Sequence, residues 1–268
     1  MTQTTTLTTT PDAALTQMRA APPLVHCITN YVAMNIAANV LLAAGASPAM
    51  LHTPEESRDF AAIAGALTIN FGTLSPNWVA GMHAAIDGAT GAGRPWVFDP
   101  VAHYASPWRG GIARDLLARN PTILRGNASE IMALAGFETA SRGPDAADSV
   151  AAAEDAARSL ATAQSCIVAV TGAVDFVTDG TRAVRVHGGD PMMARITAMG
   201  CSLTTLTGAY AATLPDPFDA TVAALAHFAA AGNVAAGAPG PASFQTLFVD
   251  ALYTATPDSL AAIPVTAA

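Results

Sequence analysis

Lysine is absent from this 268-residue chain, in which all 12 basic side chains are arginines. P-loop enzymes, protein kinases and enzymes that form a Schiff base each need a lysine amine, so these three classes are excluded. The remaining charge is sparse, because only 12% of the residues are charged, and the net charge is −8. An acidic chain without a basic cluster is a poor partner for nucleic acid, and we expect none.

Cysteine is also scarce, with three residues that lie far apart and form no CxxC pair: Cys27, Cys166 and Cys201. This set argues against a disulfide framework and against a zinc site, and it fits a reducing compartment. Histidine pairs with metal-binding spacing are missing as well. We therefore expect a cytoplasmic protein without a metal cage.

Long unbroken apolar runs are missing too. Residues 20–54 and 60–86 carry no formal charge, yet asparagine, glycine and proline interrupt both. A membrane-spanning helix needs about 20 predominantly apolar residues, so we interpret these segments as buried strand–helix units and expect no membrane contact. Residues 1–11 are rich in threonine and lack the basic start and apolar centre of a signal peptide; they predict a disordered tail.

Short apolar runs alternate with helical segments over residues 12–268, which we interpret as one domain. Strands are expected at residues 24–28, 47–51, 67–71, 96–98, 122–124 and 166–170. Asp179-Gly180 is a strong hairpin signal between strands 175–178 and 183–187. The longer helices are expected at about 144–163, 200–214, 217–236 and 241–253. This order predicts an α/β fold with a mostly parallel central sheet, helices on both faces and one antiparallel hairpin.

Polar or functional side chains follow several of these strands at their carboxyl ends, where ligands bind in open α/β sheets. They are Thr29, Asn30, Met50, Gly72, Thr73, Asp99, Arg125, Asn127 and Thr171, with residues 125–127 expected as a loop. Glu130 lies about one helical turn beyond Asn127. Two carboxylates and one arginine are therefore expected at one edge of the sheet.

A helix is expected to begin near Gly200, after a turn of small residues. Its first backbone N–H groups have no partner within the helix, and with the helix dipole they form an anion site. This anion hole comprises Ala198, Met199, Gly200 and Cys201. A thiol in this turn is expected to have a lowered pKa. The alternative is an ordinary helix start with a buried structural cysteine.

Together these groups supply what phosphoryl transfer needs: carboxylates to hold hydrated Mg²⁺, a cation for phosphates, and N–H donors for developing charge. Each residue also has a structural alternative. Asp99 can cap the next turn, and Asn127 with Glu130 can form a capping box that serves only its helix. Arg125 can be a surface ion pair, and Met50 a core residue.

Seven motifs, in order along most of the chain, resemble those of one known family. They are PLVHCITNYV at 23–32, AGASPAM at 44–50, NFGTL at 70–74, DPV at 99–101, RGNASE at 125–130, VTG at 170–172 and TAMGC at 197–201. The family is the hydroxyethylthiazole kinases of thiamine salvage, which share the ribokinase-like fold. The resemblance implies ATP-dependent phosphorylation of the primary alcohol of 4-methyl-5-(2-hydroxyethyl)thiazole by a homotrimer with active sites between subunits.

The resemblance also implies roles for single residues on the nucleotide side of the site. Arg125 and Thr171 are similar to the ATP contacts of the family. Asp99 and Glu130 are similar to its ligands for magnesium-bound water. The loop at 102–106 departs from the family, which usually has a glycine-rich loop there.

On the substrate side, Met50 and Ala198 resemble the thiazole contacts, and we add Asn30 as a further substrate contact. Cys201 occupies the position of the catalytic base, where most proteins with this fold have aspartate. Ala198 stands where the family often has glycine, so the anion hole is expected to be slightly narrower.

Three rival functions stay open from the sequence. A nucleotide-dependent NAD(P)H-hydrate dehydratase shares this fold, although Cys201 and the segment around Met50 favour the thiazole kinase. A Cys201-dependent hydrolase would use the thiol as a nucleophile. A trimer that binds nucleotide without catalysis is the third.

Overall fold

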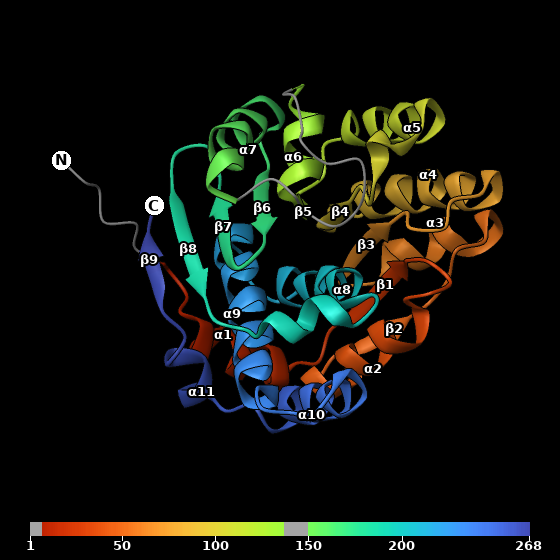
Figure 1. Cartoon of the computed structure of the whole chain (residues 1–268). Coiled ribbons are helices and arrows are strands. Elements are labelled where there is room, and N and C mark those ends of the chain that lie inside the picture. The colour runs from red at the N-terminus through yellow and green to blue at the C-terminus, as the bar shows by residue number, and fades with distance from the viewer. Residues whose placement is uncertain (1–6, 137–149) are drawn as a thin grey trace.

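The computed structural model describes residues 7–136 and 150–268, and a nine-stranded sheet runs through it (Figure 1). The strand order is β2-β1-β3-β4-β5-β6-β7-β8-β9, parallel from β2 to β6 and antiparallel from β6 to β9. The strands are β1 (Leu24–Ile28), β2 (Ser47–Ala49), β3 (Ala66–Asn70), β4 (Trp96–Asp99), β5 (Ile123–Asn127), β6 (Ile167–Thr171), β7 (Val174–Thr178), β8 (Ala183–His187) and β9 (Val265–Ala267). The expected parallel sheet and its hairpin β7–β8 are confirmed, whereas β9 was not predicted.

Helices cover both faces of the sheet, as expected for this strand–helix order (Figure 1). One layer holds α1 (Pro11–Ala20), α2 (Met34–Ala44), α8 (Met199–Ala211), α9 (Pro217–Ala235), α10 (Pro241–Thr254) and α11 (Pro257–Ala261). The other holds α3 (Pro54–Ile63), α4 (Pro76–Gly91), α5 (Pro107–Leu117), α6 (Ala128–Leu134) and α7 (Val150–Gln164). Two short 3₁₀ helices, η1 (His103–Ala105) and η2 (Pro191–Arg195), lie in loops.

The hydrophobic core consists of two clusters, one on each face of the sheet. Side chains that alternate along a strand point to opposite faces. On β1, Val25 and Cys27 accordingly belong to the cluster under α2 and α8, and Ile28 belongs to the cluster under α3 and α4. The charge-free segments that the sequence contains are therefore explained by burial on both faces.

The start of the chain differs from the expected tail. Residues 1–6 lie outside the described residues, but the Thr9 amide donates a hydrogen bond to Asp219 Oδ2 at 2.7 Å, and α1 begins at Pro11. Leu15 and Met18 of α1 are buried in the core. Residues 7–11 thus pack against the domain, because a buried carboxylate and an apolar helical stripe both need partners. Of the helix expected from residue 144, the described part begins at Val150.

The order of the strands reverses at β1. From β1 the chain passes through α2 to β2 at one edge, and then returns to add β3 and later strands on the other side of β1. In open α/β sheets, ligands bind in a crevice at such a reversal, so a ligand crevice is expected between β1 and β3. Asn30 follows β1, while Asn70 and Asp99 end β3 and β4 in direct register.

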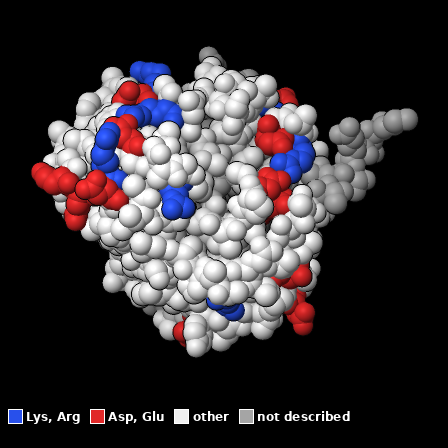
Figure 2. All heavy atoms as spheres, turned by 180° about the vertical axis from the view of Figure 1, so that it is seen from behind, with Lys and Arg blue, Asp and Glu red and all other residues white. Residues whose placement is uncertain are grey.

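Charged side chains gather in a few clusters on the face shown in Figure 2 and leave wide areas without charge. Two exposed apolar side chains, Tyr31 and Val32, directly follow Asn30 at the crevice. Within residues 7–136 and 150–268, the helices are too short or too polar to cross a bilayer.

Candidate active site

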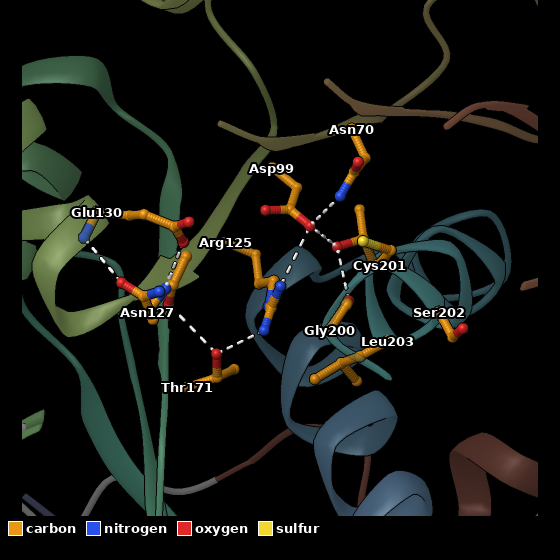
Figure 3. Close-up of polar contacts among 12 residues, drawn as sticks. Asn70, Asp99, Arg125, Asn127, Glu130, Thr171, Gly200, Cys201, Ser202 and Leu203 are labelled. Carbon is orange, nitrogen blue, oxygen red and sulfur yellow. Dashed lines mark hydrogen bonds and ion pairs between the residues drawn. The ribbon is translucent and has the colours of Figure 1, made fainter. Parts of the chain in front are cut away.

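Asp99 lies at the centre of the polar groups at this edge and is completely buried. Its Oδ2 accepts hydrogen bonds from Asn70 Nδ2 at 2.7 Å and Thr204 Oγ1 at 2.6 Å, and it pairs with Arg125 Nη1 at 3.1 Å (Figure 3). Its Oδ1 is buried and has no partner among the described residues. Burial of an unpaired carboxylate oxygen is costly, so Oδ1 is suited to a ligand or bound water. The side chain does not serve as a turn cap.

Arg125 lies inside β5, not in the expected loop. The strand continues to Asn127 because its backbone pairs with β6 as far as Thr171. The Arg125 side chain is only 11% exposed, which rules out a surface ion pair, and its Nη2 donates to Thr171 Oγ1 at 2.6 Å. Burial is the largest influence and lowers the pKa of Arg125, but the nearby negative charges, Asp99 first and then Glu130, together outweigh it and raise that pKa. The guanidinium is thus a fixed positive charge between β4 and β6.

The amino terminus of α8 faces the same place. The Ser202 amide bonds to the Ala198 carbonyl at 2.9 Å, whereas the amides of Met199, Gly200 and Cys201 have no partner among the described residues. The Arg125 guanidinium lies against Gly200, where an added Cβ would be 2.8 Å from Nη1. A cation at the positive end of a helix dipole is unfavourable by itself. Guanidinium and amides together therefore favour an anion between them.

Cys201 is half-buried in the first turn of α8. Burial, and after it the negative charge of Asp99, raises the pKa of the thiol to about 11. The expectation of a lowered pKa is therefore wrong, because loss of hydration outweighs the helix dipole and the nearby guanidinium. The thiol is neutral at pH 7, which disfavours the hydrolase alternative.

Asn30 and Asn70 connect Cys201 to Asp99. Asn30 Nδ2 donates to Asn70 Oδ1 at 2.7 Å and to Cys201 Sγ at 3.4 Å. An added Cβ on Gly72 would lie 2.7 Å from Asn30 Nδ2, so this close packing requires glycine. The role of Asn70 was missed, although an asparagine at the end of a fully buried strand is itself a signal, since a buried amide must find partners.

Glu130 forms the capping box that the sequence left open as an alternative. Its Oε2 accepts from the Asn127 amide and its Oε1 from the Ala102 amide, both at 2.9 Å, while Asn127 Oδ1 accepts from the Glu130 amide. Burial, and then the charge of Asp99, raises the pKa of Glu130. The hydrogen bond to Glu130 Oε1 comes from Ala102 in the loop at 102–106, and Ala102 adopts a left-handed conformation. Each carboxylate oxygen of Glu130 retains a lone pair, so the capping box does not prevent Glu130 from binding metal-bound water. That role stays a prediction.

Met50 and Ala198 both lie on the face of the sheet that α2 and α8 cover. Both are half-buried and pack against the hydrophobic cluster beneath α2 and α8. Met50 directly follows β2, and Ala198 directly precedes α8. Their contact with a thiazole ring stays a prediction.

Ala198 is strained, and removal of its Cβ is expected to stabilise the protein. It has φ 62° and ψ 14°, a left-handed conformation that costs a residue other than glycine about 1 kcal/mol. We expect Ala198→Gly to raise the free energy of unfolding by about 1 kcal/mol in urea titrations. The matched control is Ala118→Gly, at an exposed right-handed position with φ −63°, which should lower it. Equal destabilisation by both changes would show that the backbone of Ala198 is not strained.

Comparisons with known proteins show the family of the chain. The model of the hydroxyethylthiazole kinase family matches residues 15–258. The chain is 64% identical over 251 residues to the hydroxyethylthiazole kinase of Gemmatimonas aurantiaca, covering 93% of this chain and 90% of that protein. It is 63% identical over 254 residues to the hydroxyethylthiazole kinase of Rhizobium johnstonii, with 94% and 95% covered.

Solved structures show the same relation. The structure of the hydroxyethylthiazole kinase protein from Pyrococcus horikoshii OT3 superposes with a TM-score of 0.88 at 37% identity, covering 96% of this chain and 98% of that one. A pyridoxal kinase from Staphylococcus aureus, in complex with AMP-PCP and pyridoxal, has a TM-score of 0.61 at 16% identity over 80% of this chain and 89% of its own. The second similarity concerns the fold alone, and it confirms the ribokinase-like architecture. Because the family model and these relatives span nearly all of it, the chain belongs to the hydroxyethylthiazole kinase family.

Proposed function

We propose that this chain transfers the γ-phosphoryl group of ATP to the primary alcohol of 4-methyl-5-(2-hydroxyethyl)thiazole, a reaction of thiamine salvage. One observation carries the proposal: the unpartnered amides of α8 and the Arg125 guanidinium face one place at the sheet edge, beside the unpartnered oxygen of Asp99. Phosphoryl transfer depends mainly on positioning and on stabilising the charge of the equatorial oxygens. This arrangement supplies both.

Asp99 and Glu130 fit a hydrated Mg²⁺. The buried Oδ1 of Asp99 lacks a donor, and Mg²⁺ is commonly held by one or two carboxylates, several waters and substrate phosphates. When bound, Mg²⁺ would neutralise charge on the phosphate oxygens.

The protein groups act on the two reacting ends. Arg125, held by Asp99 and Thr171, binds the nucleotide phosphates, and the amides of Met199 to Cys201 donate to the oxygens of the transferred group. The alcohol oxygen forms a bond to the γ-phosphorus as the bond to the β–γ bridging oxygen breaks, and the alcohol proton is released to water, so the products are the phosphate ester, ADP and a proton. ADP leaves. The neutral thiol of Cys201 is a weak base, so it contributes mainly by its position beside the alcohol.

Cys201→Ser should therefore lower kcat only modestly, by less than about tenfold, whereas loss of a true general base costs about 10²–10⁴-fold. Cys201→Asp should retain or improve kcat, because a carboxylate is a stronger base than a neutral thiol. Both variants are compared in steady-state assays of ADP release, with Cys166→Ser as a buried cysteine control on the far side of the molecule. A serine variant that binds ATP and thiazole but is inactive would disprove this account of the thiol.

The reaction itself is tested by ADP release from the wild-type protein with a panel of vitamin-precursor alcohols. ADP release that requires the thiazole alcohol supports the proposal. Dehydration of hydrated NADH without phosphorylation of the thiazole would establish the dehydratase alternative. Labelling of Cys201 by an electrophilic substrate, indifferent to Mg²⁺, would establish the hydrolase.

We further propose that the chain forms a cytoplasmic homotrimer with active sites between subunits. The exposed apolar pair beside Asn30, with Tyr31 at 69% and Val32 at 56% exposure, supports a subunit contact at the site. The wide uncharged areas in Figure 2 suit burial between subunits. Three free cysteines suit a reducing compartment. Light scattering should then give three times the chain mass of 27.1 kDa.

A further inference from the structure

A chain of hydrogen bonds crosses the floor of the active site from Cys201 to Asp99. It runs from Cys201 Sγ through the amide of Asn30 and the amide of Asn70 to Asp99 Oδ2, with lengths of 3.4, 2.7 and 2.7 Å. Cys201 stands at the end assigned to the alcohol, and Asp99 at the end assigned to magnesium and phosphate. The two asparagines are buried, with exposures of 3% and 1%.

The direction of each hydrogen bond follows from its surroundings. Asn30 Oδ1 accepts from the amides of Val32 and Ala33, both at 3.1 Å, so the nitrogen of Asn30 must face Asn70 and Cys201. A carboxylate only accepts, so Asn70 must turn its nitrogen toward Asp99. Its oxygen then accepts from Asn30 and also from the Gly72 amide at 3.1 Å. Both amides are thereby locked in one orientation.

We propose that Asn70 is a positioning residue that couples the alcohol end of the site to its magnesium–phosphate end. This inference rests on the proposed roles of Cys201 and Asp99. Asn70 is the link because its oxygen holds Asn30 and its nitrogen holds Asp99. A shift of Asp99 on binding of the metal–nucleotide complex must move Asn70. Because Asn30 is packed tightly against Gly72, it has little free space in which to absorb that movement.

One neighbour, Thr204, provides a matched comparison, because it touches only the Asp99 end. Thr204 donates to Asp99 Oδ2 at 2.6 Å and has no contact with Asn30 or Cys201 among the described hydrogen bonds. Thr204→Val keeps the side-chain shape and removes that donor. Asn70→Leu keeps about the same size and removes both the oxygen that holds Asn30 and the nitrogen that holds Asp99. The first change thus disturbs one end, and the second breaks the link.

The test measures the dissociation constant of the thiazole alcohol by calorimetry, with and without saturating Mg²⁺ and the non-hydrolysable analogue AMP-PCP. In the wild-type protein, we expect the dissociation constants of the thiazole alcohol with and without Mg²⁺ and AMP-PCP to differ by at least about fivefold. This ratio is at the lower end of the range for coupled sites. Asn70→Leu and Asn70→Ser should bring the ratio close to one. Thr204→Val should weaken nucleotide binding and keep the ratio.

The outcomes separate the inference from the proposed function. A wild-type ratio of one in an enzyme that phosphorylates the thiazole would overturn the coupling alone, as would a ratio in both Asn70 variants equal to that of the wild type. Loss of the ratio in Thr204→Val would show that any disturbance of Asp99 suffices, which also overturns it. Failure of the wild-type protein to bind the thiazole alcohol would overturn the proposed function and the inference with it. A merely structural role of Asn70 lowers both affinities and leaves their ratio unchanged.

Discussion

Asp99→Asn is expected to lower kcat/KM for MgATP by about 10²–10³-fold, the largest effect of any single change in this site. Asparagine has the same shape and can still accept from Asn70 and Thr204, so the local packing is retained. The variant loses the negative charge that pairs with the buried guanidinium of Arg125, and it loses a carboxylate oxygen for metal-bound water. Steady-state kinetics at varied Mg²⁺ should show a raised Mg²⁺ requirement together with a lowered kcat.

Asp219→Asn is the matched control for this change. Asp219 is also a buried carboxylate with one unpartnered oxygen, but it holds the Thr9 amide at the start of the chain. We expect it to alter stability and leave kcat/KM unchanged. Asp99→Asn with kcat/KM within fivefold of the wild type would contradict the central place of Asp99.

The main groups of the site could be predicted because they depend on strand order. Asp99, Arg125 and Thr171 lie at or near the ends of β4, β5 and β6, which are neighbours in the sheet. Parallel strands bring their carboxyl ends to one edge, so side chains that follow consecutive strands in the sequence meet there. The hydrogen bonds from Arg125 to Asp99 and Thr171 confirm this prediction.

The partners of these groups could not be predicted, because they come from distant segments. Thr204 bonds to Asp99 across 105 positions of sequence, and inside α8 it has the pattern of an ordinary helical threonine. Asn30 and Asn70 meet only because β1 and β3 are adjacent, with β2 on the other side of β1. Side-chain pairs of this kind require the register of the strands, which composition and periodicity do not specify.

The pKa shifts of the site residues also could not be predicted from the sequence. The helix start at Cys201 predicted a lowered thiol pKa, yet burial and Asp99 raise it to about 11. Local sequence indicates the helix dipole, whereas desolvation depends on everything that packs around the group. The same applies to Glu130, whose capping box follows from four consecutive residues, but whose raised pKa follows from burial beside Asp99.

Arg125→Ala should raise the KM for ATP by about 10²-fold and the KM for the thiazole alcohol much less. The guanidinium lies between Asp99 and Thr171 and against the start of α8, where the nucleotide phosphates are expected to bind. Its removal deletes the positive charge for those phosphates and leaves the apolar side around Met50 unchanged. Initial rates with each substrate varied at saturation of the other measure the two KM values.

Two conservative variants show whether the planar fork or the charge alone matters. Arg125→Lys keeps the charge but cannot donate to Asp99 and Thr171 together, so it should fall between alanine and the wild type. Thr171→Val removes the acceptor at 2.6 Å from Nη2 and a longer hydrogen bond of 3.4 Å to the Gly126 carbonyl, and it should have a smaller effect on the same KM. Because loss of a buried ion-pair partner costs about 3–5 kcal/mol, thermal unfolding must first show that Arg125→Ala is folded. Equal rises of both KM values in a folded Arg125→Ala protein would mean that Arg125 supports the crevice as a whole, and its assignment to the nucleotide would be wrong.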